Sequence, residues 1–355
     1  MKRKIHLVGG ARPNFIKLAP LLIKLDKDNF FKTTFINTGQ HYDYMLFDKI
    51  LSDLNLRSPD VNLNVGSFSG NSQISKIMIR YEKILNKDKP DLILVFGDVN
   101  STLAAALTAK KMGIKLGHVE AGLRCYDDTL PEEVNRRITD SVSDYFFIPS
   151  ILEEKNLRKE NIKKNIFFVG NIMIDSLKVI LKKNKLNDKN KKNFGLVTLH
   201  RPENVDDFNQ LSIIIDILSK IVDSIPLVFS MHPRTYSSLK KFKLLQKIKL
   251  IENLKIYNSL GYLDFLTCMR KSKFVISDSG GVQEESSYLG IPCFTLRKNT
   301  ERPITVIEGT NKIVNSKNLI NKIKICERKK VKIDKWDGNT SERIIIILKK
   351  LIKDF

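Results

Sequence analysis

The sequence of 355 residues has little of what marks membrane-spanning, disulfide-rich or zinc-binding proteins. It has only four cysteines, and they lie far apart without a CxxC pair, so we expect reduced thiols and no zinc site. The longest wholly apolar runs, such as 92–96 and 344–348, fall far short of the roughly 20 residues that cross a membrane. The sequence therefore predicts no membrane insertion. The cysteines are Cys125, Cys268, Cys293 and Cys326.

Common motifs of metal, nucleotide and hydrolase sites are absent as well. The chain contains no HExxH, GxGxxG, GxxxxGK[ST] or GxSxG motif, and its five histidines are scattered. Residues 1–6 are basic, but no apolar segment of signal-peptide length follows them. We therefore expect a cytoplasmic protein without a bound metal. The histidines are His6, His41, His118, His200 and His232.

Positive charge is the one unusual bulk property. The 61 Lys and Arg residues outnumber the 39 Asp and Glu residues, which gives a net charge of +22. Such an excess can bind nucleic acid, an anionic membrane surface or an anionic substrate, or it can simply keep the surface solvated. The lysine clusters at 178–192 and 240–255 are poor in aromatic residues, which disfavours nucleic-acid binding. We interpret the excess as a solvated, lysine-rich surface.

The chain is longer than a single core of ~250–300 residues, and strands and helices alternate along it. This pattern predicts α/β architecture with two Rossmann-like, doubly wound domains that face each other across a cleft. The expected domains are 1–170 and 171–338, followed by a closing amphipathic helix in 339–355, with 182–193 as an exposed loop. Strands are predicted at 4–8, 31–36, 91–96, 115–119, 145–149, 194–198, 226–231, 254–257, 274–277 and 292–296. Helices are predicted at 14–27, 101–112, 132–142, 172–181, 206–224, 262–271, 281–289 and 341–353.

Polar residues follow the predicted strands of the first half, where ligands of doubly wound sheets bind. Arg12 and Lys17 flank a glycine-rich turn and a helix start, which suits an anion, although a surface arginine on a plain turn fits too. Asp98 and Glu120 end neighbouring strands, and Glu132 opens a helix. A capping role for Asp98 and a helix-dipole role for Glu132 are the structural alternatives. Three converging carboxylates favour acid–base chemistry instead.

In the second half of the chain, polar residues again follow the predicted strands. His200 follows a strand within His-Arg-Pro-Glu-Asn, and Arg234 follows the next strand within His-Pro-Arg. Ser279, Gly280 and Gly281 open a helix directly after a strand, so their backbone N–H groups can bind a phosphate; a plain helix cap is the alternative.

Two further residues complete the second half of the predicted site. Glu285 lies one turn into the helix that Ser279 opens and suits a ribose hydroxyl. Arg302 lies in a loop after a strand and suits a phosphate.

Eight motifs occur in a fixed order between residues 9 and 310, and together they resemble the non-hydrolysing UDP-N-acetylglucosamine 2-epimerases. This resemblance implies the two-domain fold of GT-B type glycosyltransferases, with the C-terminal helix crossing back to the first domain. It also implies a homodimer, a UDP-sugar substrate, and no need for a metal or nicotinamide cofactor. The motifs are GARPNFIKLAPL, TGQHYDYM, GDVNST, HVEAGLR, LPEEVNRR, HRPEN, SDSGGVQEE and TERPITVIEGT.

The resemblance also implies roles for single residues. Asp98, Glu120 and Glu132 match the family's essential carboxylates, and His200 matches a histidine implicated in nucleotide handling and elimination. Arg12 and Lys17 match cations that contact substrate and phosphate. Positions that hold the diphosphate and ribose match Ser279, Gly281, Glu285 and Arg302. The implied reaction interconverts UDP-N-acetylglucosamine and UDP-N-acetylmannosamine through a bound 2-acetamidoglucal, for cell-surface polysaccharide precursors.

Departures from the family pattern bear on substrate and regulation. Relatives activated by their own substrate often carry Gln-His-Arg where this chain has Gln40-His41-Tyr42, so we expect no such activation. Related sequences with Gln-His-Tyr-Asp include enzymes that act on UDP-2,3-diacetamido-glucuronic acid, which is the alternative substrate. Hydrolysing 2-epimerases tend to carry Gly-Thr-Arg-Ala-Asp at the first motif, and Ala11-Arg12-Pro13-Asn14 argues against that activity. A glycosyltransferase would leave the three carboxylates without a purpose.

Overall fold

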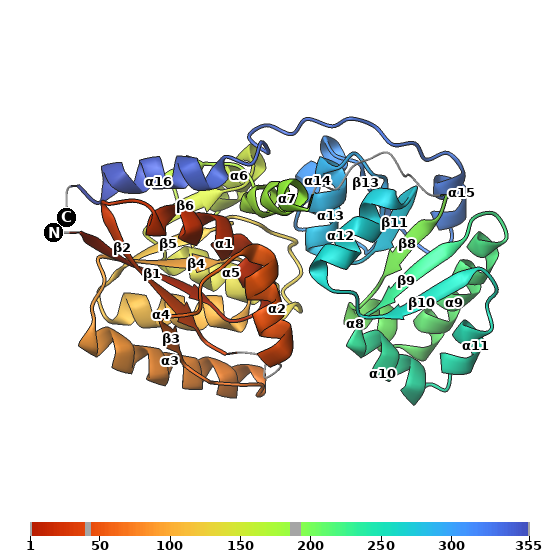
Figure 1. Ribbon diagram of the computed structural model, residues 1–355, viewed down its shortest axis with the longest axis horizontal. Coiled ribbons are helices and arrows are strands. Elements are labelled where there is room, and N and C mark those ends of the chain that lie inside the picture. The colour runs from red at the N-terminus through yellow and green to blue at the C-terminus, as the bar shows by residue number, and fades with distance from the viewer. Residues whose placement is uncertain (1, 40–43, 185–192, 354–355) are drawn as a thin grey trace. The chain divides into compact units, whose positions relative to one another are not determined.

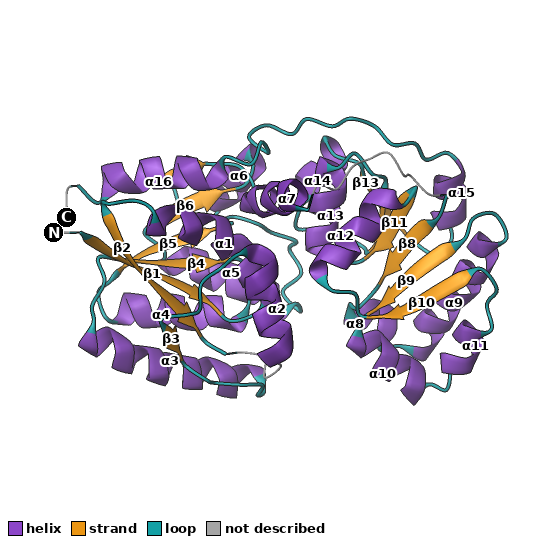
Figure 2. Cartoon of the chain, viewed as in Figure 1, coloured by secondary structure: helices purple, strands orange, loops and turns teal. Residues whose placement is uncertain are grey.

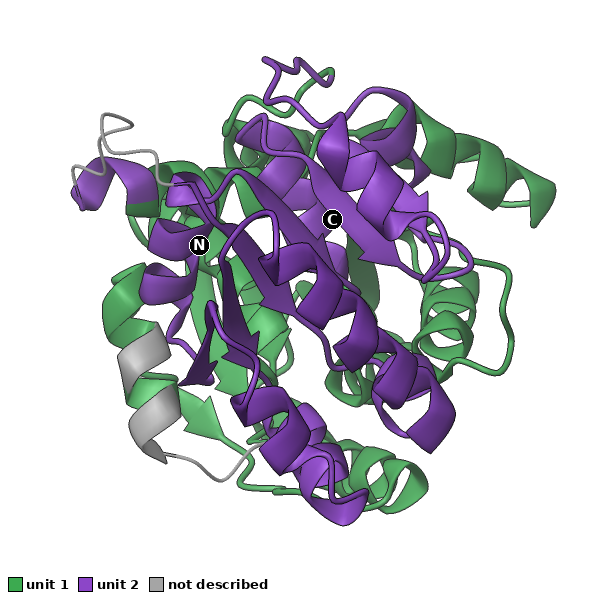
Figure 3. Cartoon of the chain, turned by 90° about the vertical axis from the view of Figure 1, so that its right-hand side faces the viewer, with its two compact units in different colours: residues 1–180, 334–355 green, residues 181–333 purple. Residues whose placement is uncertain are grey.

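The structure is a computed structural model that describes residues 2–39, 44–184 and 193–353. The chain forms two compact units (Figures 1 and 3). Unit 1 comprises Met1–Ile180 and Asp334–Phe355, and unit 2 comprises Leu181–Ile333. The first boundary lies within helix α7 (Ile172–Lys183), whereas the sequence predicted it between residues 170 and 171.

Unit 1 is built on a seven-stranded parallel sheet in the order β3-β2-β1-β4-β5-β6-β7. The chain reverses its direction across the sheet between β1 and β4, which makes their carboxyl ends the topological switch point. Every residue of β4 is buried, as expected of a central strand with helices on both faces. The strands are β1 (Arg3–Gly9), β2 (Phe31–Asn37), β3 (Val61–Asn62), β4 (Leu92–Phe96), β5 (Lys115–Val119), β6 (Tyr145–Ile148) and β7 (Ile166–Phe168).

Helices cover both faces of this sheet (Figure 2). Helices α1 and α16 pack together on one face, and α3 and α4 pack together on the other. Of these, the sequence missed α3, whose exposed face is largely polar. The helices of unit 1 are α1 (Arg12–Asp26), α2 (Tyr44–Leu54), α3 (Gly70–Lys87), α4 (Asn100–Lys111), α5 (Pro131–Val142), α6 (Ile151–Lys159), α7 and α16 (Thr340–Leu351).

The C-terminal helix belongs to unit 1, which confirms the crossing back that the sequence predicted. The buried carboxylate of Asp175 on α7 caps α16, because it accepts hydrogen bonds from the backbone N–H groups of Thr340 at 3.1 Å and Ser341 at 2.8 Å. Just before α16, the indole N–H of Trp336 donates to the carbonyl of Pro149 at 3.1 Å.

Unit 2 is built on a six-stranded parallel sheet in the order β10-β9-β8-β11-β12-β13. Its switch point lies between β8 and β11, which are hydrogen-bonded neighbours. The strands are β8 (Gly195–Thr198), β9 (Leu227–Met231), β10 (Leu254–Asn258), β11 (Phe274–Ser277), β12 (Cys293–Leu296) and β13 (Asn311–Val314). The helices are α8 (Pro202–Val205), α9 (Phe208–Val222), α10 (Pro233–Lys241), α11 (Leu245–Lys249), α12 (Tyr262–Lys271), α13 (Gly280–Tyr288), α14 (Pro303–Ile307) and α15 (Leu319–Lys324).

Helix α9 shows why the unit 2 helices form where they do. Leu211, Ile214 and Leu218 are buried at helical spacing and pack into the core of the sheet. The sequence predicted one helix over 206–224, but the structure begins α9 later because the Asp207 carboxylate caps it, accepting from the Gln210 N–H at 2.7 Å.

Two parallel α/β sheets with a C-terminal helix on the first unit confirm the GT-B-like fold expected from the sequence. No helix in the described ranges is long and apolar enough to cross a bilayer. The four cysteines are free thiols.

A buried histidine makes the stability of unit 1 depend on pH. His6 on β1 is fully buried, and its pKa falls from 6.5 to about 4, chiefly because burial opposes the charged form. The unfolded chain therefore takes up a proton first as pH falls below 6.5, so stability is full above pH 6.5 and is lost towards pH 4. We expect the free energy of unfolding to drop by about 2 kcal/mol from this group between pH 7.5 and 5. Urea unfolding should show a smaller drop for His6→Gln; an equal drop contradicts the assignment.

Candidate functional site

The switch point of unit 1 is held together by the side chain of Asn14, which connects the ends of β1 and β4. The Asn14 side chain accepts from the N–H groups of Gly10 at 3.3 Å and Ala11 at 3.2 Å, and it donates to the carbonyl of Phe96 at 2.7 Å. A Cβ atom on Gly10 would lie 1.9 Å from the Thr38 hydroxyl, so only glycine fits there. The turn that follows β1 is therefore packed rigidly beside the end of β4.

Lys17 and Glu120 form a buried ion pair at this edge of the sheet. Lys17 lies on α1 and Glu120 follows β5; their residues are only 5% and 3% exposed, and the ammonium donates to the carboxylate. Gly97 lies against both, since a Cβ atom there would approach the Lys17 ammonium to 2.6 Å and the Glu120 carboxylate to 3.4 Å. Glu120 itself has a φ of 73°, a left-handed conformation that costs a non-glycine residue energy.

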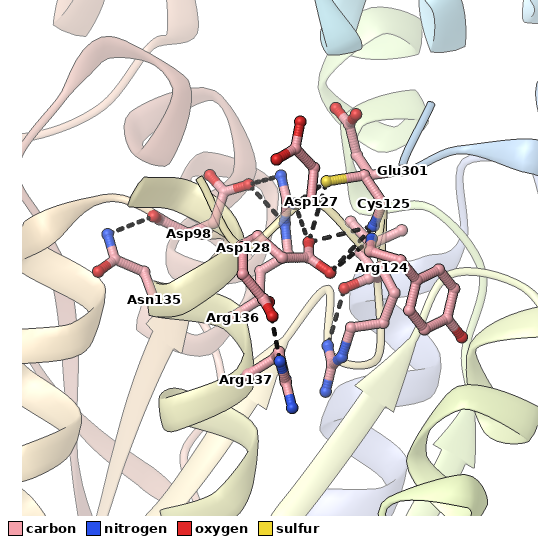
Figure 4. A network of polar contacts seen from close by, with 12 residues as sticks. Asp98, Arg124, Cys125, Asp127, Asp128, Asn135, Arg136, Arg137 and Glu301 are labelled. Atoms are coloured by element: carbon pink, nitrogen blue, oxygen red, sulfur yellow. Dashed lines mark hydrogen bonds and ion pairs between the residues drawn. The ribbon is translucent and has the colours of Figure 1, made fainter. Parts of the chain in front are cut away.

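Asp98, the residue after Gly97, pairs with a different cation. Arg136 on α5 donates from Nε to the Asp98 carboxylate at 2.9 Å, and a second guanidinium N–H donates to the same oxygen (Figure 4). Asn135 donates to the Asp98 carbonyl at 2.9 Å. Another Arg136 nitrogen donates to the fully buried Glu133 at 2.7 Å. Glu133 in turn accepts the Cys125 N–H at 3.1 Å.

These pairings modify the expectation of three repelling carboxylates. Asp98 and Glu120 follow neighbouring strands as predicted, but each faces a buried cation. Glu132 is half-buried at the start of α5, next to Glu133, which is the fully buried member of the Arg136 network. Arg12 is the exposed first residue of α1.

A second buried network underlies the same turns. His118 on β5 and Asp140 on α5 are both fully buried, with 2.7 Å between Nδ1 and Oδ1. The other ring nitrogen of His118 lies 2.8 Å from the carbonyl oxygen of Gly97. Asp140 also pairs with Arg124 at 2.7 Å and accepts the Gly122 N–H at 3.1 Å. The buried His118–Asp140 pair therefore fixes both turns, the one after β4 through Gly97 and the one after β5 through Gly122.

In unit 2, Asp278 at the switch point connects the end of β11 to the loop that follows β8. It follows β11, is fully buried, and accepts from the backbone N–H groups of His200 and Arg201 at 3.0 Å and the Asn204 amide at 2.9 Å. The His200 Nδ1 atom lies 3.2 Å from the same carboxylate. Burial raises the Asp278 pKa, but the hydrogen bonds and charge of His200 and the bonds from Asn204 and Arg201 outweigh it, so the pKa lies below its ordinary value. An anionic Asp278 thereby fixes the loop that carries His200.

The helix start after Asp278 packs closely against Arg302. Ser279 is the N-cap residue of α13, and its side chain makes no capping bond. Arg302 packs against Gly280, since a Cβ atom on Gly280 would lie 2.6 Å from a guanidinium nitrogen. The arginine is 5% exposed and pairs with Glu284 at 2.8 Å and with Glu301.

Backbone N–H groups at a helix N-terminus with a guanidinium beside them suit a diphosphate, but here Glu284 and Glu301 offset the charge of Arg302. Gly281 follows Gly280 in the first turn and is half-exposed.

Two other predicted residues of unit 2 have protein partners. The Glu285 carboxylate accepts the phenolic O–H of the buried Tyr262 at 2.6 Å. Arg234 lies at the exposed start of α10 and donates to Asp206 at 3.1 Å. The His200 and His232 rings lie with their centroids 5.0 Å apart.

Some residues of these networks were not predicted from the sequence. The spacing of Glu133 and Arg136, one helical turn apart in the motif that opens α5, was a usable signal for their ion pair. Contacts such as Asp278 with the loop after β8 join residues far apart in sequence, which no local pattern reveals. Residues 40–43, which include Tyr42, lie outside the described residues. Among those described, no group of three or more His, Cys, Asp or Glu side chains could hold a metal ion.

Comparisons with known proteins place these features in a family context. Residues 23–349 match the model of the family described as UDP-N-acetylglucosamine 2-epimerase. The UDP-N-acetylglucosamine 2-epimerase of Methanocaldococcus jannaschii is 41% identical over 97% of this chain and 98% of its own length. A crystal structure of that archaeon's epimerase in complex with UDP-GlcNAc and UDP has a TM-score of 0.91 at 40% identity, covering 98% and 99% of the chains. The UDP-2,3-diacetamido-2,3-dideoxy-D-glucuronate 2-epimerase of Pseudomonas aeruginosa is 33% identical, covering 88% of each.

Proposed function

The chain belongs to the UDP-N-acetylglucosamine 2-epimerase family, and we propose that it interconverts UDP-N-acetylglucosamine and UDP-N-acetylmannosamine without hydrolysis. It is therefore an isomerase. A relative of 41% identity across nearly the whole chain supports this assignment more strongly than any other single observation. We further infer from family membership that the protein is a homodimer and supplies precursors of cell-surface polysaccharide from the cytoplasm; light scattering of the purified protein tests the dimer.

The reaction that we propose is an elimination followed by an addition. A base removes the proton from C2 of the sugar, and the C2–H electron pair becomes the C1=C2 double bond. The C1–O bond breaks, and its electron pair leaves with the β-phosphate of UDP. UDP then adds back to C1 of the 2-acetamidoglucal while C2 receives a proton on the opposite face. Atoms and electrons balance without an oxidant or a metal.

Unit 1 supplies the proton-transfer groups of this proposal. Asp98 and Glu120 are carboxylates at neighbouring strand ends of a switch point, each oriented by a buried cation. A carboxylate held in one rotamer is prepared to accept or donate a proton at a fixed place. Glu132 opens the helix that carries Arg136 and completes the proposed catalytic set. Arg12 is proposed to contact the substrate's phosphate.

Unit 2 supplies the UDP-binding groups. Ser279, Gly280 and Gly281 begin α13 and present backbone N–H groups, and Arg302 adds a guanidinium beside them. These groups stabilise the charge that develops on the departing diphosphate. We assign Glu285 to the ribose. His200, held by Asp278, is assigned to nucleotide handling and elimination.

Arg234 is proposed as a more distant phosphate contact. It can serve in that way only by exchanging its bond to Asp206 for one to substrate.

The alternative substrate is a modified UDP-sugar, which the Pseudomonas relative of 33% identity favours. Proton and phosphorus NMR of the purified protein with UDP-N-acetylglucosamine, without added metal or nicotinamide, tests the proposal. We expect UDP-N-acetylmannosamine with the C1–O–P linkage intact. Free N-acetylmannosamine and UDP would establish hydrolysis instead. UDP binding without reaction would move the test to UDP-2,3-diacetamido-glucuronic acid.

A further inference from the structure

The two ring nitrogens of His118 both face hydrogen-bond acceptors. Nδ1 lies 2.7 Å from Asp140 Oδ1, and Nε2 lies 2.8 Å from the carbonyl oxygen of Gly97. A carbonyl oxygen cannot donate, and an ionised carboxylate cannot donate either. A neutral imidazole carries one N–H and would leave a nitrogen lone pair against an oxygen lone pair. Both short contacts are satisfied only when both ring nitrogens carry a proton.

The carboxylate of Asp140 is the ionised partner in this arrangement. Burial raises its pKa, but the charge and hydrogen bond of His118 and those of Arg124 outweigh burial, and the pKa lies below its ordinary value. The Oδ2 atom accepts the Gly122 N–H at 3.1 Å and lies 2.7 Å from the Arg124 guanidinium. His118, Gly122 and Arg124 all direct N–H groups at this carboxylate. Asp140 therefore accepts from all three as an anion, and the shared proton stays on His118.

The His118–Asp140 pair contacts both turns that carry the proposed acid–base groups: the turn with Gly97 and Asp98, and the turn with Glu120 and Gly122. The Gly97 carbonyl belongs to the peptide that joins Gly97 to Asp98, and the Gly97 N–H donates to the carbonyl of Val119 at 3.1 Å. Gly97 has a φ of 63°, a left-handed conformation open to glycine, and the hydrogen bonds of its N–H and carbonyl hold the turn in place. Gly122, held by Asp140, ends the turn that begins with Glu120.

We propose that His118 is an imidazolium, protonated on both ring nitrogens, that together with Asp140 positions Asp98 and Glu120 for catalysis. The catalytic part of this inference rests on the proposed function, whereas the charge state of the ring does not. His118 is fully buried and beneath the turns, so it is a positioning residue rather than a catalytic one.

Loss of the His118 proton has a definite consequence. One of its two hydrogen bonds becomes a repulsive contact between lone pairs, and the Gly97–Asp98 turn loses its anchor. The charged groups that surround the ring and its two partners are Asp140 and Arg136 on α5, Arg124 and Glu120 after β5, Lys17 on α1, and Glu160 behind Arg124.

Nitrogen NMR of the unmodified enzyme tests the charge state directly. We expect long-range proton–nitrogen spectra of the protein labelled with ¹⁵N-histidine, at about pH 8 and above the ordinary histidine pKa of about 6.5, to show one doubly protonated ring. His118→Gln should remove that signal. Should this variant not fold, substitution of the other four histidines in turn assigns the signal by elimination. A neutral tautomer at His118 overturns the proposal.

Kinetics test the positioning role. In His118→Gln, which can keep only one of the two contacts, kcat should fall about 10- to 100-fold with little change in KM, because misplaced groups cost that much. Asp140→Asn, which removes the ionised partner of the ring and of the Gly122 N–H, should lower kcat in the same range with little change in KM. The control is His6→Gln, a change at a buried histidine of the same sheet that contacts Tyr81, and it should leave kcat unchanged.

The outcomes separate this inference from the proposed function. A folded His118→Gln enzyme with native kcat contradicts the positioning role. Absence of epimerase activity in the unmodified protein contradicts the proposed function, while the nitrogen spectra still decide whether His118 is an imidazolium.

Discussion

Replacing Asp98 by Asn or Glu120 by Gln is expected to lower kcat by about 10²-fold or more, the range of general acid–base catalysis. Each substitution keeps the shape of the side chain but removes the group that can accept or donate a proton. Glu132→Gln is expected to have an effect of the same order. Steady-state conversion of UDP-N-acetylglucosamine, followed by NMR, gives the rates.

A control separates loss of chemistry from loss of structure. Glu82 is an exposed glutamate of unit 1 on α3, and Glu82→Gln should turn over at the native rate. The Asp98 and Glu120 variants should still bind UDP with near-native affinity, because the groups assigned to UDP are Arg12 and residues of unit 2, and neither substitution removes them. Near-native rates in all three active-site variants would show that these carboxylates do not perform the chemistry.

Replacing Arg302 by Ala should weaken UDP binding by about 10- to 100-fold, since a charge-assisted hydrogen bond contributes about 1.5–3 kcal/mol. The same change leaves the carboxylates of Glu284 and Glu301, which are 1% and 2% exposed, without that cation. Breaking a buried pair in this way costs about 3–5 kcal/mol of stability. Calorimetric titration with UDP and urea unfolding measure the two effects on one preparation.

Two further variants make this result specific. Arg302→Lys keeps the charge but not the planar fork, so it should recover part of the stability and less of the affinity. Lys312 is an exposed cation on β13 of the same unit, and Lys312→Ala should change neither quantity. Native UDP affinity in a folded Arg302→Ala protein would remove this arginine from the binding site.

The sequence predicts much of this fold because its strongest signals are local. The continuous apolar run 92–96 is typical of a buried strand, and the glycine-rich turns after β1 and β11 begin helices within two residues of the predicted starts. Helix α6 was missed because short amphipathic segments carry weak periodicity. The strand β3 has two residues, too few for any pattern.

The sequence predicted which residues lie at the candidate site but not the ion pairs and hydrogen bonds that connect them. Asp98 and Glu120 could be placed together because parallel strands end at one edge. Their partners Arg136 and Lys17 are 38 and 103 residues away, and only the fold brings them into contact. The sequence singled out Glu132, whereas in the structure Glu133 is the fully buried partner of Arg136.

The central claim is that the C2 proton is removed and replaced during epimerisation while UDP is never lost to solvent. Proton and phosphorus NMR of the unmodified enzyme with UDP-N-acetylglucosamine in D₂O measures both events in one sample. The account predicts UDP-N-acetylmannosamine that carries deuterium at C2, with phosphorus still bound as a UDP-sugar. Product that retains its C2 proton, or release of free sugar as the main product, would contradict it.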